Sequence, residues 1–309
     1  MSVLSAPHFH NEEAAFAKLE SVVWPNGPVC PHCGETEKVY AIKPNPEKRV
    51  RIGLKKCGKC RKQFTVKVGT VFEHGRVPLH KFLQAVYLMC ASKKGVSAKQ
   101  LERTLEVTYK TAWFMAHRIR EAMRAGVLDV PFGSEGGAVE VDETFIGKEP
   151  GVPKKRSFHH KMKVLTLVDR DTKQSRSVVV DDLKPATLAP VLNENIAREA
   201  RLMTDEARHY ATIGKAFAEH ETVNHGRDEY VRGDVTTNTV ESYFSVFKRG
   251  MRGVYQHCGK QHLHRYLAEF DFRYNNRERL GVNDRERTDA ALSAIVGKRL
   301  TYRGPDAQA

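Results

Sequence analysis

The stretch Ala138-Val-Glu-Val-Asp-Glu-Thr-Phe-Ile146 decides the fold, because its apolar and polar residues alternate as they do in a β-strand. This pattern places Asp142 beside Val139 and Val141 within an apolar strand. An unpaired carboxylate is costly in such a position, so Asp142 is a candidate functional residue.

The residues that follow predict the rest of a sheet. Residues 163–169 and 175–180 have strand patterns, residues 188–200 have a helical pattern, and residues 201–205 form a short apolar strand that ends in Asp205. Three strands, a helix and a fourth strand, with one Asp on the first strand and another at the end of the fourth, follow the order of an RNase H-like fold. We therefore expect an α/β domain with a mixed sheet.

A third acid lies on a helix predicted at about residues 239–251. One stripe of this helix is apolar and consists of Val240, Phe244, Phe247 and Met251. A second stripe, about 100° around the helix, consists of Glu241, Ser245, Lys248 and Arg252. The apolar stripe is expected to pack on the sheet, which turns Glu241 toward Asp142 and Asp205. Lys248 and Arg249 are expected to contact DNA.

Three converging carboxylates match phosphoryl-transfer chemistry with two metal ions. Two Mg²⁺ ions roughly 3.5–4 Å apart would activate water and stabilise the attacking and leaving oxygens of an in-line displacement. Mg²⁺ suits such a site because it prefers hard oxygen ligands and keeps bound water. The predicted magnesium ligands are Asp142, Asp205 and Glu241.

Four of the six cysteines form two pairs, Cys30-Pro-His-Cys33 and Cys57-Gly-Lys-Cys60, with 23 residues between them. Two C-x-x-C pairs at this separation can supply four thiolates to a tetrahedral Zn²⁺. Residues 38–42 and 49–52 have strand patterns, as a zinc ribbon requires. Disulfide bonds are disfavoured in a chain without a secretion signal, and a redox C-x-x-C would need one pair rather than two. We therefore expect a structural zinc site.

The basic residues are concentrated in one segment. Residues 41–130 contain 20 Lys or Arg and 6 Asp or Glu, so they account for the whole formal net charge of +14, and the other 219 residues sum to zero. A concentrated positive segment favours binding to nucleic acid, because each neutralised phosphate releases counterions.

Helical patterns within this segment predict a helix-turn-helix. Ser97 is expected to cap a short helix through Leu105, Glu106–Thr108 form a turn, and a longer helix runs from Tyr109 to about Met123. The start of the second helix supplies the candidate DNA-contacting residues Tyr109, Lys110, Thr111 and Trp113. An ordinary helical hairpin is the alternative, and the location in the basic segment favours DNA contact.

Together these motifs resemble the DDE transposases of bacterial insertion sequences, specifically the ISXO-type group with an N-terminal zinc ribbon. The resemblance covers nearly the whole chain. It is carried by Trp24-Pro-Asn-Gly-Pro-Val-Cys-Pro-His-Cys-Gly, Val141-Asp-Glu-Thr-Phe-Ile-Gly, Thr237-Asn-Thr-Val-Glu-Ser-Tyr-Phe-Ser-Val-Phe-Lys-Arg-Gly and His264-Arg-Tyr-Leu-Ala-Glu-Phe-Asp-Phe-Arg-Tyr-Asn. The chain departs from the pattern where Gly147 is followed by Lys148.

The resemblance implies that Asp142, Asp205 and Glu241 are the catalytic triad. Lys248 follows Glu241 by seven residues on the same predicted helix. Related elements can have Asn where the third acid is expected, so Asn238 is a rival that we expect to assist Glu241. The implied function is a metal-dependent DNA transposase that binds terminal inverted repeats and cleaves the ends of the element. The freed 3′-hydroxyl of each end then attacks target DNA, which joins the two strands. The implied partners are double-stranded DNA and a further copy of the chain, as a homodimer or higher oligomer on DNA.

Two other functions stay open. A zinc-ribbon transcriptional regulator would bind DNA without cutting it, but it leaves the three acids without a role. A structure-selective nuclease would use the same acids but would not join strands.

The expected organisation has four segments: an N-terminal helix and zinc ribbon at 1–75, a helix-turn-helix at 76–130, an RNase H-like catalytic domain at 135–285, and a C-terminal tail at 286–309. The stretch Gly133-Ser-Glu-Gly-Gly137 is expected to be a linker. No apolar run approaches about 18 residues, and the first residues do not have the pattern of a secretory signal. We therefore expect a bacterial cytoplasmic protein, associated with the nucleoid and without a membrane segment.

Overall fold

Five strands form one mixed sheet in the order β6-β5-β4-β7-β8. Their bounds are Ala138–Ile146 for β4, Met162–Asp169 for β5, Ser175–Val180 for β6, Arg201–Thr204 for β7 and Glu219–Thr222 for β8. The strands β4, β5 and β6 pair antiparallel, whereas β4 pairs parallel with β7 and β7 pairs parallel with β8. The alternating stretch that begins at Ala138 therefore forms the central strand of a mixed α/β fold.

The computed structural model describes residues 2–126, 128–154 and 157–301. The chain divides into two compact units. The first consists of the residues up to Met123 together with those from Gly281 onward, and the second is Arg124–Leu280, which contains the five-stranded sheet.

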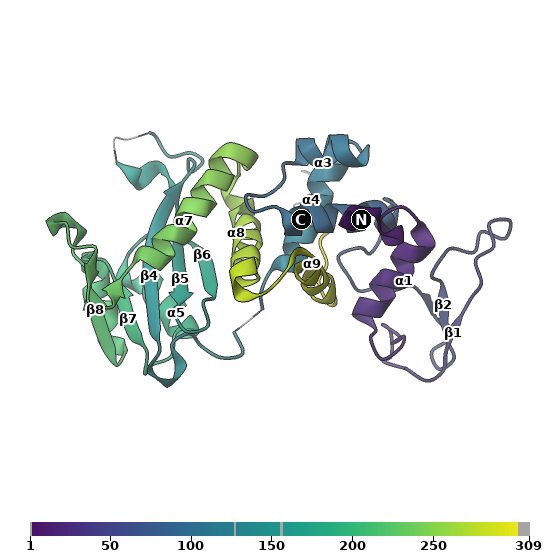
Figure 1. Cartoon of the computed structure of the whole chain (residues 1–309), viewed down its shortest axis with the longest axis horizontal. Helices are drawn as coiled ribbons and strands as arrows, with labels where there is room; N and C mark the ends of the chain where they lie inside the picture. Colours follow the sequence, from purple (N-terminus) through teal and green to yellow (C-terminus); the bar gives the residue numbers. More distant parts are fainter. Residues whose placement is uncertain (1, 127, 155–156, 302–309) are drawn as a thin grey trace. The chain divides into compact units, whose positions relative to one another are not determined.

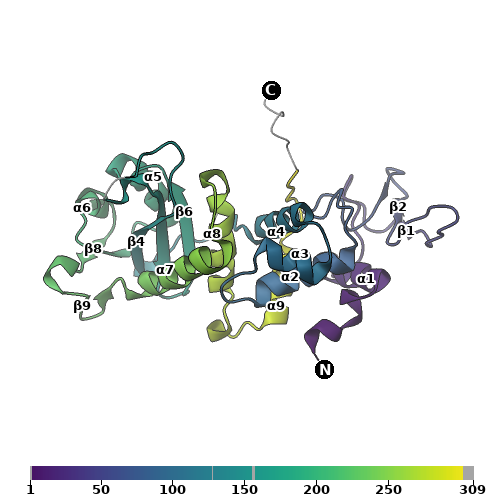
Figure 2. The same ribbon diagram turned by 90° about the horizontal axis from the view of Figure 1, so that it is seen from above.

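Helices cover both faces of the sheet in the second unit, and Figure 2 shows α5 and α6 on one side of it and α7 on the other. Their bounds are Pro185–Asn195 for α5, Arg208–Ile213 for α6, Asn238–Gly250 for α7 and Lys260–Asn275 for α8. A π-helical turn, Met251–Tyr255, continues α7, and two short strands, Val231–Arg232 (β9) and Val235–Thr236 (β10), precede it.

Two apolar cores result from the alternation of β4. Val139 and Val141 point toward α5 and α6, where they pack with Leu188 and Tyr210. On the opposite face, the core contains the predicted apolar stripe of α7, that is Val240, Phe244, Phe247 and Met251, together with Leu263, Tyr266, Leu267 and Phe270 of α8. The predicted orientation of α7 is therefore confirmed.

The first unit combines helices with a small three-stranded sheet (Figure 1). The helices are Glu12–Val23 (α1), Leu79–Ala91 (α2), Ala98–Leu105 (α3), Tyr109–Met123 (α4) and Asp284–Ser293 (α9), and the strands are Val39–Ala41 (β1), Lys55–Cys57 (β2) and Gln63–Phe64 (β3). Helix α2 contacts α1, α3, α4 and α9. Helix α9 begins two residues before the predicted C-terminal tail at 286–309 and extends into it, so part of that segment packs into the first unit.

Two local predictions were wrong. Residues 49–52 do not form a strand, because the chain turns at Asn45–Val50 and Arg49 has a positive φ of 54°. The strand begins only at Lys55, after Gly53, whose missing side chain leaves room for the ring of Phe16. The stretch from Gly133 to Gly137 is not a free linker, because the backbone N–H of Gly133 donates to Asp169 Oδ2 at 2.8 Å and a Cβ at Gly133 would collide with Ala200.

Among the described residues, no helix is both long enough and apolar enough to cross a membrane.

Candidate functional site

Asp142 and Asp205 are brought together by the parallel pairing of β4 and β7. The register places Val139 opposite Leu202 and Glu140 opposite Met203. If this register continues for two more residues, Asp142 lies opposite Asp205, which directly follows β7. Neighbouring strands lie about 4.8 Å apart, so the two backbones are close at this edge.

The electrostatics of Asp142 reflect these neighbours. Burial disfavours its charged form and, together with the negative charges of Glu143, Asp205 and Glu241, raises the pKa of Asp142 to about 8. A hydrogen bond from the backbone N–H of Glu143 to Asp142 Oδ1, at 2.7 Å, opposes the shift. Burial also raises the pKa of Asp205. Several carboxylates therefore gather at one place, and a cation among them would relieve their repulsion.

Glu241 joins the two aspartates from the first turn of α7. Its Oε1 accepts a hydrogen bond from Thr237 Oγ1 at 3.0 Å and lies 3.7 Å from His225 Nε2. Its charge acts on the pKa of Asp142, as described above. The structure thus brings the three sequence-predicted acids to one end of the sheet.

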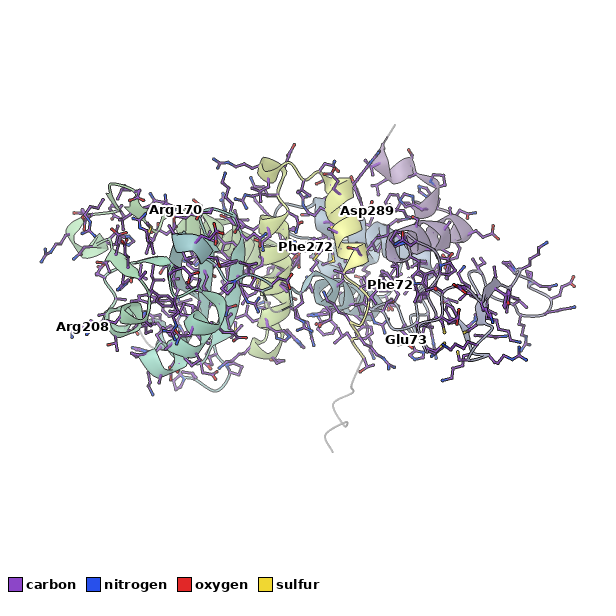
Figure 3. The ribbon with its side chains drawn as sticks, turned by 90° about the horizontal axis from the view of Figure 1, so that it is seen from below. Phe72, Glu73, Arg170, Arg208, Phe272 and Asp289 are labelled. Carbon is purple, nitrogen blue, oxygen red and sulfur yellow. The ribbon has the colours of Figure 1, made fainter. Side chains whose placement is uncertain are left out.

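The start of α7 is held by a residue that the sequence analysis did not single out. Glu140 is fully buried on β4, and its carboxylate accepts hydrogen bonds from Thr239 N at 2.8 Å, Thr239 Oγ1 at 2.7 Å and Val240 N at 3.0 Å. Arg170, labelled in Figure 3, places its Nε 3.6 Å from Glu140 Oε1. Free N–H groups at a helix N-terminus favour a carboxylate, so Glu140 fixes α7 to the strand that bears Asp142. The alternation along β4 could have indicated this role, because it places Glu140 on the same face of the strand as Asp142.

A second unforeseen acid is Glu143, on the opposite face of β4. Its Oε2 accepts a hydrogen bond from the buried Tyr210 hydroxyl at 2.7 Å and lies 3.5 Å from His209 Nε2. Burial raises the pKa of Tyr210 well above its usual range, and the charge of Glu143 adds to this shift. Glu143 therefore has neutral or positive partners on its own side, while its charge still acts on Asp142.

Lys248 lies two turns beyond Glu241 and is half-buried. Burial lowers the pKa of Lys248, the positive charges of Arg252 and Lys161 lower it further, and the negative charges of Asp142 and Glu241 oppose this. Its Nζ lies 5.8 Å from the centre of the Phe244 ring. Arg249 is exposed on the same helix, and Asn238 is exposed at its first position.

The three carboxylates are not grouped as tightly as the four cysteines. Among residues 2–126, 128–154 and 157–301, the four cysteines are the one group of three or more possible ligands whose donor atoms all lie within 4.8 Å of one another. At least one of the distances between the carboxylates of Asp142, Asp205 and Glu241 is therefore longer than 4.8 Å.

The four cysteines lie close enough to bind one metal ion. Cys30 Sγ is 3.7 Å from Cys60 Sγ, and Cys33 Sγ is 3.6 Å from Cys57 Sγ. A regular tetrahedron with zinc–sulfur bonds of about 2.3 Å has sulfur–sulfur edges of about 3.8 Å. The sulfur positions therefore fit a zinc ribbon, which Trp24, Val39 and Phe64 cover with apolar surface.

The predicted helix pair also lies in the first unit. Ser97 Oγ accepts from Gln100 N at 3.1 Å and caps α3, which ends at Leu105, and a turn with Glu106 at φ 52° leads into α4 at Tyr109. Tyr109 and Lys110 are exposed, whereas Thr111 and Trp113 are half-buried. The first turn of α4 thus offers side chains at the surface, as a DNA-contacting helix requires.

The two units therefore define a modular class of protein, in which a four-cysteine ribbon accompanies an α/β sheet with clustered acids. Comparisons with known proteins agree with this. The profile of the ISXO2-like transposase domain matches residues 135–275, and the profile of the transposase zinc-ribbon domain matches residues 10–63. The chain belongs to the ISXO2-like transposase family.

Two relatives extend the match. A protein of Halobacterium salinarum, named as an uncharacterized protein in transposable element ISH50, is 30% identical over 291 residues, which cover 86% of this chain and 91% of the relative. An uncharacterized transposase-like protein of Haemophilus influenzae is 26% identical over 102 residues, which cover 33% of this chain and 81% of the relative.

Proposed function

We propose that this chain is the transposase of an insertion sequence, and that it cuts DNA at the ends of its element and joins the freed ends to target DNA. Membership of the ISXO2-like transposase family supports this proposal, as does the likeness to a protein of transposable element ISH50. The alternative of a regulator that only binds DNA leaves the clustered acids without a role.

The sheet is proposed to be of the RNase H-like type. The strand order is β6-β5-β4-β7-β8, and β5 alone runs antiparallel to the other four strands of this sheet. This arrangement supports an RNase H-like fold. The observation that carries the catalytic proposal is the meeting of three acids from different elements: Asp142 from β4, Asp205 after β7, and Glu241 from a helix anchored to β4 by Glu140.

The proposed reaction has two displacements at phosphorus. In the first, water attacks a phosphodiester at the end of the element and the 3′-oxygen leaves as a hydroxyl. In the second, that hydroxyl attacks a target phosphodiester, so a new P–O bond forms and a target P–O bond breaks. Mg²⁺ ions bound by Asp142, Asp205 and Glu241 would polarise the phosphate and stabilise the leaving oxygen. Lys248 is proposed to hold the DNA backbone beside these acids, with Arg249 contacting DNA further along the helix.

The first unit is proposed to recognise the element ends. Cys30, Cys33, Cys57 and Cys60 would hold one structural Zn²⁺, and the α3–α4 pair would act as a helix-turn-helix with Tyr109, Lys110, Thr111 and Trp113 against DNA. We propose that the segments 1–75, 76–130, 135–285 and 286–309 have separate functional roles. Because both ends must be held together, we propose a homodimer or higher oligomer on DNA, working at the bacterial nucleoid.

The test is cleavage and strand transfer on labelled DNA that carries the element ends. Wild type, Asp142→Asn and Glu241→Gln would be compared with Mg²⁺ and without it. Joined products that need Mg²⁺ and both acids are the expected result, with DNA affinity nearly unchanged in Asp142→Asn. Glu194→Gln is a matched control, because Glu194 is an exposed acid on α5 and should leave the reaction unchanged.

Other outcomes have distinct meanings. Tight DNA binding without cleavage under any condition would overturn the enzymatic proposal in favour of the regulator or of an inactive copy. Cleavage without joined products would identify a nuclease. Activity that survives Glu241→Gln would move the third metal ligand to Asn238 or to another residue.

A further inference from the structure

An open pocket of about 580 Å³ lies in the second unit beside the acids. Its lining includes two phenyl rings and four cations, namely Phe145, Phe158, Lys154, Lys161, Lys248 and Arg252, and Ser157 and His160 complete it. Among the residues that the structure describes, no Asp or Glu lines it. We call it the cationic aromatic pocket. Its Lys248 also interacts electrostatically with Asp142 and Glu241.

The aromatic part of the pocket is a stacked pair. The ring centres of Phe145 and Phe158 are 4.2 Å apart, and their planes differ by 28°. Phe145 follows Asp142 by three residues on β4, and Phe158 lies in a short 3₁₀ helix, Phe158–His160. Phe158 is 44% exposed, although the cores described above bury nearly all of their phenyl rings. An exposed ring backed by a second ring offers a flat face on which a nucleobase can stack.

The cationic part is short of counter-charges. Lys161 and Arg252 have no carboxylate within 4.0 Å among the described residues. The neighbouring Lys163 and Lys260 are paired instead, since Lys163 Nζ lies 3.4 Å from Glu149 and Lys260 Nζ lies 2.8 Å from Asp181. The positive charges of Arg252 and Lys161 both act to lower the pKa of Lys248. An anion with several charges would neutralise this cluster, and a nucleic-acid backbone supplies such charges at regular intervals.

The position of the pocket indicates which part of the DNA would reach it. Lys248 lines the pocket together with Lys161 and Arg252, and it also interacts electrostatically with Asp142 and Glu241. A strand with one phosphate at the acids can therefore place its neighbouring nucleotide in the pocket. A base paired within a duplex keeps its face stacked against its neighbours, so only an unpaired base can cover Phe158.

We propose that the cationic aromatic pocket binds an unpaired nucleotide of the DNA strand next to the phosphodiester that is cleaved. The base stacks on Phe158, which Phe145 supports, and the flanking phosphates contact Lys161, Lys248 and Arg252. This proposal rests on the proposed function for the identity of the strand, but the binding itself needs no cleavage.

The test measures binding of the full-length protein to two labelled single-stranded probes of equal length, an oligothymidylate and an oligonucleotide made of abasic sites. Unlabelled duplex DNA in excess would occupy the first unit, and no Mg²⁺ would be added. Both probes offer the same phosphates, but only oligothymidylate offers bases. Wild type should prefer oligothymidylate by roughly five- to a hundredfold, the range expected for one stacked base. Phe158→Ala should abolish this preference and leave binding of the abasic probe unchanged.

The charges give an independent expectation. The double variant Lys161→Ala, Arg252→Ala should weaken binding of both probes equally. It should also reduce the slope of log affinity against log salt by about 0.7 for each lost phosphate contact. Lys215→Ala is the matched control, because Lys215 is exposed in the second unit and lies outside the pocket.

A second measurement locates the base. An oligonucleotide containing 5-iodouracil, irradiated in complex with wild type, should cross-link to Phe158 or Phe145, as identified by mass spectrometry. Val130→Ala, which alters a side chain that is 65% exposed in the same unit, should leave the cross-link in place.

The proposal is overturned if wild type binds both probes equally, or if Phe158→Ala retains the preference. It is also overturned if the cross-link maps outside the pocket. These outcomes are separate from the proposed function. Cleavage without a preference for bases would remove the pocket proposal alone, whereas a preference dependent on Phe158 without cleavage would remove the catalytic proposal alone.

Discussion

At the scale of single residues, Asp142 is an acid that the fold keeps in an unfavourable setting. It lies among the carboxylates of Glu143, Asp205 and Glu241 and is largely buried, and its pKa is raised to about 8. A binding site for a cation has this character before the cation arrives, because the repulsion that destabilises the metal-free protein is what the cation relieves.

We predict that Asp142→Asn stabilises the protein in buffer without divalent metal. Below about pH 4, Asp142 carries a proton in both the folded and the unfolded state, so the substitution has little effect. Between pH 4 and pH 8 the unfolded state loses this proton and the folded state keeps it, so the stability of the wild type falls as the pH rises. The variant should therefore melt a few degrees higher at pH 8 and equally at pH 4, measured by thermal denaturation.

Added Mg²⁺ supplies the control for this prediction. It should raise the melting temperature of the wild type and not that of Asp142→Asn, because the variant lacks a metal ligand. A variant that melts below the wild type at neutral pH without metal would show that Asp142 has a structural role instead.

At the scale of elements, strong periodicity made most of the second unit predictable. The strands β4 and β6 begin and end at the predicted residues, and α4 and α7 lie within one residue of their predicted bounds. Weakly patterned elements were missed. Strand β8 has the polar sequence Glu-His-Glu-Thr and lies at the edge of the sheet. Its extended conformation depends on pairing with β7, a contact between distant parts of the chain that no local sequence pattern indicates.

The candidate site was predictable to the same extent. Asp142, Asp205 and Glu241 stood out because each interrupts or ends an apolar pattern or lies on a helical stripe. The role of Glu140 and the cationic aromatic pocket were not predictable, since both depend on which elements become neighbours. Glu140 has its partners 99 and 100 residues later in the chain, and the Phe145 ring contacts that of Phe158, which belongs to a different element.

Glu140 gives the prediction at this scale, because it joins one element to another. In Glu140→Gln, an amide replaces the carboxylate, so one oxygen is left to accept the hydrogen bonds from Thr239 and Val240. The second unit should lose about 1–3 kcal/mol of stability. Because α7 also carries Glu241, the Mg²⁺ concentration needed for half-maximal cleavage should rise several-fold, measured well below the melting temperature.

A separate readout distinguishes positioning from stability alone. The maximal cleavage rate at saturating Mg²⁺ should fall less than the metal affinity does, and Glu140→Asp, which keeps the charge, should recover part of that affinity. An unchanged Mg²⁺ requirement in Glu140→Gln would contradict the proposed link between β4 and the metal ligands.

At the scale of the whole molecule, charge and metal chemistry are divided between two units. The basic segment 41–130 lies almost entirely in the first unit, as do the four cysteines and both tryptophans, Trp24 and Trp113. The acids and the cationic aromatic pocket belong to the second unit. Tryptophan fluorescence therefore reports on the first unit alone. Trp24 is the more useful probe, because it packs edge-on to Phe64 at 6.0 Å beside the cysteines.

We predict that removal of zinc affects only the functions of the first unit. The ribbon has a small apolar core, so loss of the metal should unfold it and expose Trp24 to water, which shifts its emission to longer wavelength. Affinity for duplex DNA should fall by roughly tenfold or more, because basic side chains lose their arrangement. The preference for oligothymidylate over the abasic probe should persist, since Phe158 and its cationic neighbours lie in the other unit. If stoichiometric release of zinc, followed with a colorimetric dye, left the duplex affinity unchanged, recognition of the element ends would rest on α3 and α4 without the ribbon.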